Sequence, residues 1–133
     1  IILNKSGKKS INEIFEKHGE KKFRELEQRI ATTLVNKKNI VVSSGGGVIM
    51  NNITMNLLKE DSIIVFLSTD FTTIEKRLVN TANRPLWKNI EQTKKLFKIR
   101  QPLYMLHADI TVVTDGKSLE KITEEIVERM AII

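Results

Sequence analysis

Residues 40–50 have the sequence IVVSSGGGVIM, in which three glycines separate two short apolar runs. The β-branched run before the glycines predicts a strand from Ile40 to Ser43 that ends in a loop without side chains. Because glycine has no Cβ, its backbone can approach a bound polar molecule closely. Ligands of open α/β sheets bind at the carboxyl ends of strands. We therefore expect Gly45, Gly46 and Gly47 to contribute to a binding site.

Helical and strand patterns alternate on both sides of this stretch. The run over residues 62–67 is apolar after its first serine, which is typical of a strand buried on both faces of a parallel sheet. The other predicted elements are helices from Ser10 or Asn12, from Glu20 to Asn36, from Asn51 or Asn52 and after Asp70, a long helix kinked at Pro102, a strand over 110–113 and a closing helix after Gly116. This alternation predicts one layered α/β domain over residues 1–133.

Composition sets bounds on location and partners. A chain of 133 residues with 41% hydrophobic residues fits one domain with a respectable core. It has no cysteine, no apolar run long enough to cross a membrane and no secretory leader, so we expect a cytoplasmic protein that does not bind membranes. The net charge of +6 predicts attraction of anions. The low aromatic content of 5% argues against a base-stacking surface for nucleic acid.

Arginines add to the expected anion site. Arg24 and Glu27 lie three residues apart on a predicted helix, where they form a same-face ion pair. Spacing alone favours an ordinary surface pair. Arg84 lies in the polar segment Arg84-Pro85-Leu86-Trp87, and Arg100 precedes a proline near a predicted helix kink.

These motifs occur together in an order that resembles shikimate kinase. The resemblance covers essentially the whole chain and is carried by Gly19-Glu20, Phe23-Arg24, Glu27, the triple glycine, Arg77, Arg84-Pro85-Leu86 and Arg100-Gln101-Pro102-Leu103-Tyr104. It implies a three-layer α/β/α fold with a parallel sheet, like that of P-loop kinases, and transfer of the γ-phosphoryl group of ATP to a ring hydroxyl of shikimate. The product would be shikimate 3-phosphate, in the biosynthesis of chorismate and the aromatic amino acids.

The resemblance also implies a role for each site residue. Arg24 and Arg100 would grip the carboxylate of shikimate, with Glu27 holding Arg24 in place, and the three glycines would meet the ring through their backbone. Arg84 would belong to a lid over about residues 80–92 and reach the transferring phosphate, while Arg77 would flank the adenine, although an ordinary surface role for Arg77 is nearly as good. Shikimate and ATP are then the expected partners, and the protein a monomer.

One part of the family pattern is missing from the chain. No G-x-x-x-x-G-K-[S/T] phosphate loop occurs, and Gly7-Lys8-Lys9-Ser10 lacks the earlier glycine and the preceding strand. The acidic pair linked to Mg²⁺ in the family is also missing, so we expect the ligands of ATP-bound Mg²⁺ mainly from a segment upstream. The chain begins Ile1-Ile2 without an initiator methionine. We expect an N-terminal truncation that removes central strands and leaves this chain poorly folded or inactive by itself.

Other functions stay open from the sequence. The same fold serves kinases of gluconate or nucleotides, although two arginines directed at a carboxylate favour a small acid. A chain without the phosphate loop is also consistent with a non-catalytic anion-binding remnant or a basic nucleic-acid module.

Overall fold

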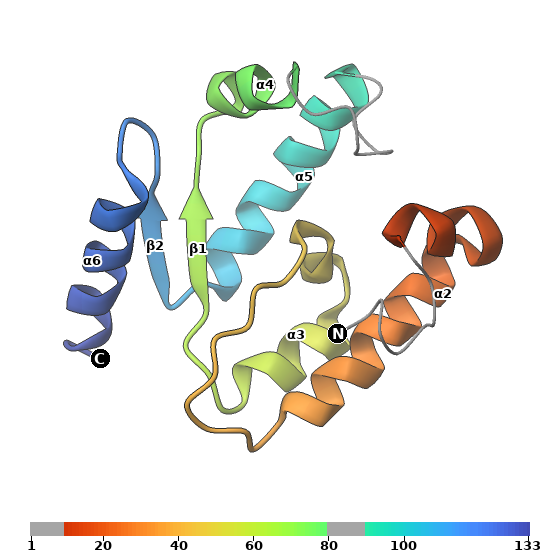
Figure 1. The fold of residues 1–133 in the computed structure, drawn as a ribbon, viewed down its shortest axis with the longest axis horizontal. Coiled ribbons are helices and arrows are strands. Elements are labelled where there is room, and N and C mark those ends of the chain that lie inside the picture. The colour runs from red at the N-terminus through yellow and green to blue at the C-terminus, as the bar shows by residue number, and fades with distance from the viewer. Residues whose placement is uncertain (1–9, 80–89) are drawn as a thin grey trace. The chain divides into compact units, whose positions relative to one another are not determined.

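The computed structural model describes residues 10–79 and 90–133 (Figure 1). The chain divides into two compact units, residues 1–62 and 63–133, which are described separately below. The first unit contains α2, η1 and α3, and the second contains β1, α4, α5, β2 and α6. The single domain predicted for residues 1–133 stays a prediction. The expected lid over about residues 80–92 lies almost entirely outside the described residues.

The first unit begins with the long helix α2, Ile11–Leu34. Ser10 caps it, because the side-chain oxygen of Ser10 accepts a hydrogen bond of 3.1 Å from the amide of Glu13. Gly19 interrupts the helix with φ of 75° and ψ of 171°, backbone angles that are essentially restricted to glycine. The two predicted helices are therefore two segments of α2 that meet at Gly19. One side of these segments is buried through Ile14, Phe23, Ile30 and Ala31.

The strand predicted from Ile40 to Ser43 is not present. These residues form neither helix nor strand, and the side chain of Val41 is 100% exposed. A β-strand is stabilised by hydrogen bonds to a neighbouring strand. Within residues 10–79 and 90–133, the only strand pairing joins β1 to β2. The β-branched composition of Ile40 to Val42 is therefore not sufficient to make a strand in this structure.

The triple glycine leads into a short 3₁₀ helix, η1, Gly46–Met50, and then into α3, Asn52–Lys59. Val48 and Ile49 of η1 are buried together with Met55 of α3. Asn51 caps α3 by accepting a hydrogen bond of 3.1 Å from the amide of Thr54, and the helix begins where it was predicted to, after Asn51. In the first unit α3 packs against both α2 and η1, so the glycine segment is anchored on its carboxyl side by a buried core.

The second unit contains a two-stranded parallel sheet (Figure 1). Its strands are β1, Val65–Ser68, and β2, Ile110–Val113, and their register pairs Val65 with Ile110. Ile110 and Val112 are buried, whereas Leu67 is exposed. The predicted strand over 62–67 is present as β1, but it begins and ends later in the sequence. The prediction that it is buried on both faces is wrong, because Leu67 is exposed. The predicted second strand over 110–113 is confirmed.

Three helices complete the second unit: α4, Phe71–Val79, α5, Ile90–His107, and α6, Leu119–Met130. Aromatic rings connect α5 to its neighbours, with centroids 4.9 Å apart for Phe66 and Tyr104 and 5.4 Å apart for Phe71 and Phe97. The helix α6 packs on β2. These contacts pack α5 against β1 and α4, and α6 against β2.

The helix α5 continues through Pro102 to His107. The spacing of its leucines and isoleucines in the sequence is typical of an apolar stripe, but only Leu96 and Leu103 are partly buried, while Ile99 and Leu106 are exposed. None of the described helices is long and apolar enough to span a membrane.

Candidate functional site

In the first unit, the side chain of Arg24 is held between two carboxylates of the same helix. Its Nη1 donates to Oε2 of Glu27, while Nη2 and Nε lie 3.1 and 3.4 Å from Oε1 of Glu20. The Arg24 side chain is 17% exposed and that of Glu27 is 8% exposed. The pair is therefore largely buried, and the surface pair favoured by spacing alone is wrong. A buried carboxylate fixes a guanidinium more firmly than an exposed one, because water competes less.

The same guanidinium lies against the backbone of the triple glycine. A Cβ placed on Gly47 would lie 2.8 Å from Cζ of Arg24 and closer still to Nη2, which is a steric overlap. A Cβ at Gly45 would meet no atom within 4 Å. A side chain at Gly47 would thus displace the guanidinium of Arg24, although the φ of Gly47 is not in the left-handed region. The structure brings together two elements that the sequence analysis placed in one site.

The backbone of the glycine segment is partly engaged within the first unit. Gly46 and Gly47 form the first residues of η1, and the amide of Val48 donates to the carbonyl of Gly45 at 3.1 Å. The carbonyl of Gly45 is therefore already used by η1. Gly45 itself is exposed and extended, with φ of −72° and ψ of 145°.

In the second unit, Arg100 is a partly buried cation on α5. Its Nε atom is buried and has no hydrogen-bond partner among the described residues. A buried donor without a partner costs about 1–3 kcal/mol, more where the group is charged. A guanidinium in this condition is suited to receive an anion, and its fork of donors matches a carboxylate.

The carboxyl ends of β1 and β2 carry a second polar cluster, centred on Asp115. Its Oδ2 accepts a hydrogen bond of 3.0 Å from the amide of Asp70, at the start of α4. The hydroxyl of Thr73, the amide of Asp70 and the positive charge of Arg77 hold the pKa of Asp115 below its ordinary value of 3.8. Asp115 therefore acts as a charged cap that joins the loop after β2 to the beginning of α4.

Threonines strengthen the same junction. Oγ1 of Thr69 and Oγ1 of Thr114 lie 2.6 Å apart, and the hydroxyl of Thr114 donates to the carbonyl of Ser68 at 3.2 Å. The ends of the two strands are thus joined by side chains as well as by the sheet. Arg77 lies on α4 beside this junction and is exposed, so its predicted contact with adenine stays a prediction.

The low pKa of Asp115 leads to a test by pH. Because its folded pKa is below 3.8, the carboxylate stabilises the fold above that value, and this contribution is lost as the pH falls through the folded pKa. Asp115→Asn should therefore lower the thermal unfolding midpoint at pH 7. The difference from the wild type should shrink as the pH falls from about 4 through the lower, folded pKa. A difference that stays constant over this range would contradict the assigned role of the charge.

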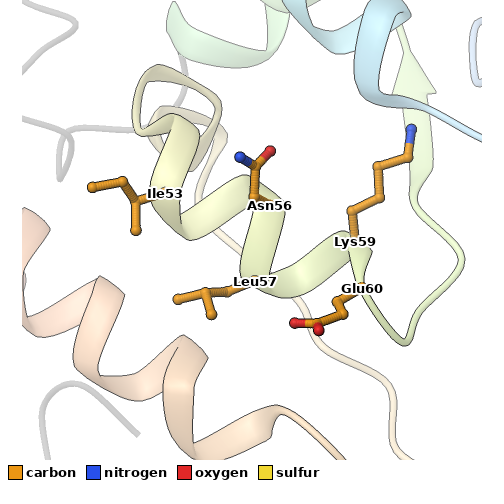
Figure 2. A pocket seen from close by; sticks show the side chains of 5 residues that line it. All are labelled: Ile53, Asn56, Leu57, Lys59 and Glu60. Atoms are coloured by element: carbon orange, nitrogen blue, oxygen red, sulfur yellow. The ribbon is translucent and has the colours of Figure 1, made fainter.

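A hollow of about 560 Å³ lies elsewhere in the first unit, on α3 (Figure 2). It is lined by Ile53, Asn56, Leu57, Lys59 and Glu60. Ile53 and Leu57 project from one side of the helix, while Asn56 and Lys59 project from another. None of the predicted site residues lines it. We do not assign it as the functional site, since its polar groups do not converge on one point.

The predicted site residues lie in different parts of the chain. Arg84 lies outside the described residues. Arg100 and Arg77 belong to the second unit, and Arg24 with the glycines to the first. Two contributors were given no role from the sequence: Glu20, whose spacing of four residues from Arg24 is a detectable signal, and Asp115, which follows the second strand. Among the described residues no group of three or more acidic, histidine or cysteine side chains could hold a metal ion.

Comparisons with known proteins find similarity to one family. The family model for shikimate kinase matches residues 1–131. A shikimate kinase of Sulfurihydrogenibium sp. (strain YO3AOP1) is 41% identical over 131 residues, covering 98% of this chain and 78% of the relative. One of Caldicellulosiruptor saccharolyticus is 40% identical over 126 residues, covering 92% of this chain and 73% of the relative.

Solved structures are similar as well. The shikimate kinase from Acinetobacter baumannii in complex with shikimate has a TM-score of 0.90 and 32% identity, covering 98% of this chain and 74% of that one. The shikimate kinase from Aquifex aeolicus has a TM-score of 0.81 and 32% identity, covering 98% of this chain and 75% of that one. They confirm the predicted α/β class with a parallel sheet, like that of P-loop kinases. The chain belongs to the shikimate kinase family.

Proposed function

We propose that the protein phosphorylates shikimate with ATP, and that Arg24 and Arg100 bind the carboxylate of shikimate. The observation that carries this proposal is the approach of Arg24 to Gly47, with Glu27 buried behind the guanidinium. Family membership supplies the reaction class, a transfer of a phosphoryl group to shikimate. The similar Acinetobacter baumannii enzyme is described in complex with shikimate, which supports the same substrate here.

The two arginines have different surroundings, and we expect them to contribute differently to binding of the carboxylate. The charge of Arg24 is already neutralised by Glu27, so Arg24 contributes hydrogen-bond donors in a fixed orientation more than net positive charge. Arg100 has no counter-ion among the described residues, so it offers an uncompensated charge. Together they would orient the carboxylate end of the ring, and the glycine segment would admit the ring without a side-chain clash. Holding the acceptor hydroxyl in line is the main task of such an enzyme.

Fewer residues of this chain are candidates for binding ATP and the transferring phosphoryl group. Arg84, in the segment outside the described residues, would stabilise charge on the transferring phosphoryl group, as the resemblance implies. Arg77 would lie beside the adenine, next to the junction formed by Asp115. When bound, Mg²⁺ neutralises charge on the phosphates of ATP. The described residues offer no cluster of ligands for it, and the chain has no phosphate loop, so we assign no metal ligand here.

Two finer properties belong to the same proposal. We propose a cytoplasmic enzyme, because the absence of cysteine suits a reducing compartment. We also propose a monomer, since one guanidinium pair and one glycine segment within a single chain account for the acceptor site.

The function can be tested by measuring the binding of shikimate and of ATP separately, together with phosphoryl transfer, in the full-length protein. We expect shikimate to bind without ATP, and turnover to require both. Binding of shikimate should weaken strongly in Arg24→Ala, because a charge-assisted bidentate contact is lost. Turnover of gluconate or of a nucleotide in place of shikimate would contradict the proposal.

A further inference from the structure

The guanidinium of Arg24 presents two distinct edges, and both are occupied. One edge is used by Glu27 through Nη1. The other edge, formed by Nε and Nη2, faces a single oxygen of Glu20 at 3.4 and 3.1 Å. That edge is the fork with which an arginine binds both oxygens of a carboxylate. A substrate carboxylate that binds Arg24 in this way must therefore meet Glu20.

The two glutamates differ in how firmly they are placed. The side chain of Glu27 is 8% exposed, and that of Glu20 is 57% exposed. Glu20 also contributes one oxygen to two donors, at distances near the long end of the hydrogen-bonding range. Exposed ion pairs four residues apart on a helix are weak, equivalent to about a twofold change in an equilibrium. Glu27 is thus the fixed partner of Arg24, and Glu20 the exchangeable one.

The backbone gives Glu20 a favourable position even when it is not paired. Gly19 interrupts α2 with φ of 75°, so Glu20 stands at the beginning of the second helical segment. Carboxylates are favourable in the first turn of a helix because its amide groups carry partial positive charge. Loss of the contact with Arg24 therefore leaves Glu20 in a position that suits a negative charge.

We infer that Glu20 is a resident counter-ion that occupies the substrate edge of Arg24 and is replaced there by the carboxylate of shikimate. This inference rests on the proposed function, since it takes shikimate as the ligand of Arg24. Glu20 acts through Arg24 and competes with the substrate, so it is a residue that lowers affinity. Its presence keeps Arg24 oriented while no substrate is bound.

The test is the replacement Glu20→Gln in the full-length protein, with kinetics at saturating ATP. We expect KM for shikimate to fall about two- to threefold with kcat unchanged, because Glu20 competes only in the free enzyme and its removal favours the bound substrate and the transition state equally. Glu25→Gln is the matched control, since it removes one negative charge from the same helix but breaks a pair with Lys22 instead. It should leave KM for shikimate unchanged.

A second comparison separates direct competition from a general effect of charge. In an Arg24→Ala background, Glu20→Gln should no longer lower KM, whereas a general effect of charge would persist. The inference is overturned if Glu20→Gln raises KM, if Glu25→Gln lowers it equally, or if the gain survives in Arg24→Ala. If the wild-type protein does not bind shikimate at all, the proposed function fails, which is a different and recognisable result.

Discussion

Gly47→Ala should raise the dissociation constant of shikimate about 10- to 100-fold in the full-length protein, by displacing the guanidinium of Arg24. The added methyl group would overlap Cζ and Nη2 of Arg24, as the 2.8 Å separation from Cζ shows. The end of an arginine side chain can move, so the backbone need not shift. We therefore expect a small loss of unfolding free energy and a large loss of substrate affinity, measurable by calorimetry of binding and of unfolding.

Two comparisons make this result specific. In an Arg24→Ala background, Gly47→Ala should have little further effect on shikimate binding, because the atom that it displaces is gone. Gly45→Ala should not lower the unfolding midpoint, since its Cβ would meet nothing within 4 Å and its φ of −72° suits any residue. Equal losses of affinity from Gly47→Ala with and without Arg24 would show that the methyl group blocks the substrate directly.

Arg100→Ala is expected to raise the dissociation constant of shikimate about 100-fold while sparing the binding of ATP. The guanidinium has a buried Nε without a partner among the described residues, so its removal breaks no described ion pair. Stability should therefore stay the same or rise, in contrast to the usual effect of losing a partly buried arginine. Parallel measurements of shikimate affinity and of the thermal unfolding midpoint test both expectations.

Lys98→Ala is the matched control for Arg100, because Lys98 is an exposed cation on the same helix. It should change shikimate affinity less than twofold, the scale of an exposed charge. Arg100→Lys should be intermediate, since lysine keeps the charge but lacks the planar fork. An Arg100→Ala protein that binds shikimate normally but unfolds at a lower temperature would assign Arg100 a structural role.

Local sequence signals predicted several elements well because they act over only a few residues. The side chain of Asn51 and the turn ending at Gly116 placed the starts of α3 and α6 correctly. Gly19, with its positive φ, explains why two helical patterns flank one position. These features depend on capping and on backbone angles, which a short window of sequence contains.

Longer-range properties were harder to predict. Ile40 to Val42 have strand composition, yet a strand also needs a paired neighbour, which composition does not report. The same limit applies to Arg24 and Glu27, whose spacing predicts a pair but not its burial, because burial comes from the packing of the first unit around them. Arg100 was identified by its resemblance to a family motif, and its unpaired Nε could only come from the structure.

The segment from Ile40 to Ser43 has a consequence for handling the protein. Its apolar side chains are exposed, and among the described residues no hydrogen bond engages its backbone. Such a segment is a template on which a second molecule can add, which is the first step of aggregation. Aggregation through this segment, where it is uncovered, should therefore increase with protein concentration. A lysine in place of Val41 would act as a gatekeeper charge there without altering Arg24 or Gly47.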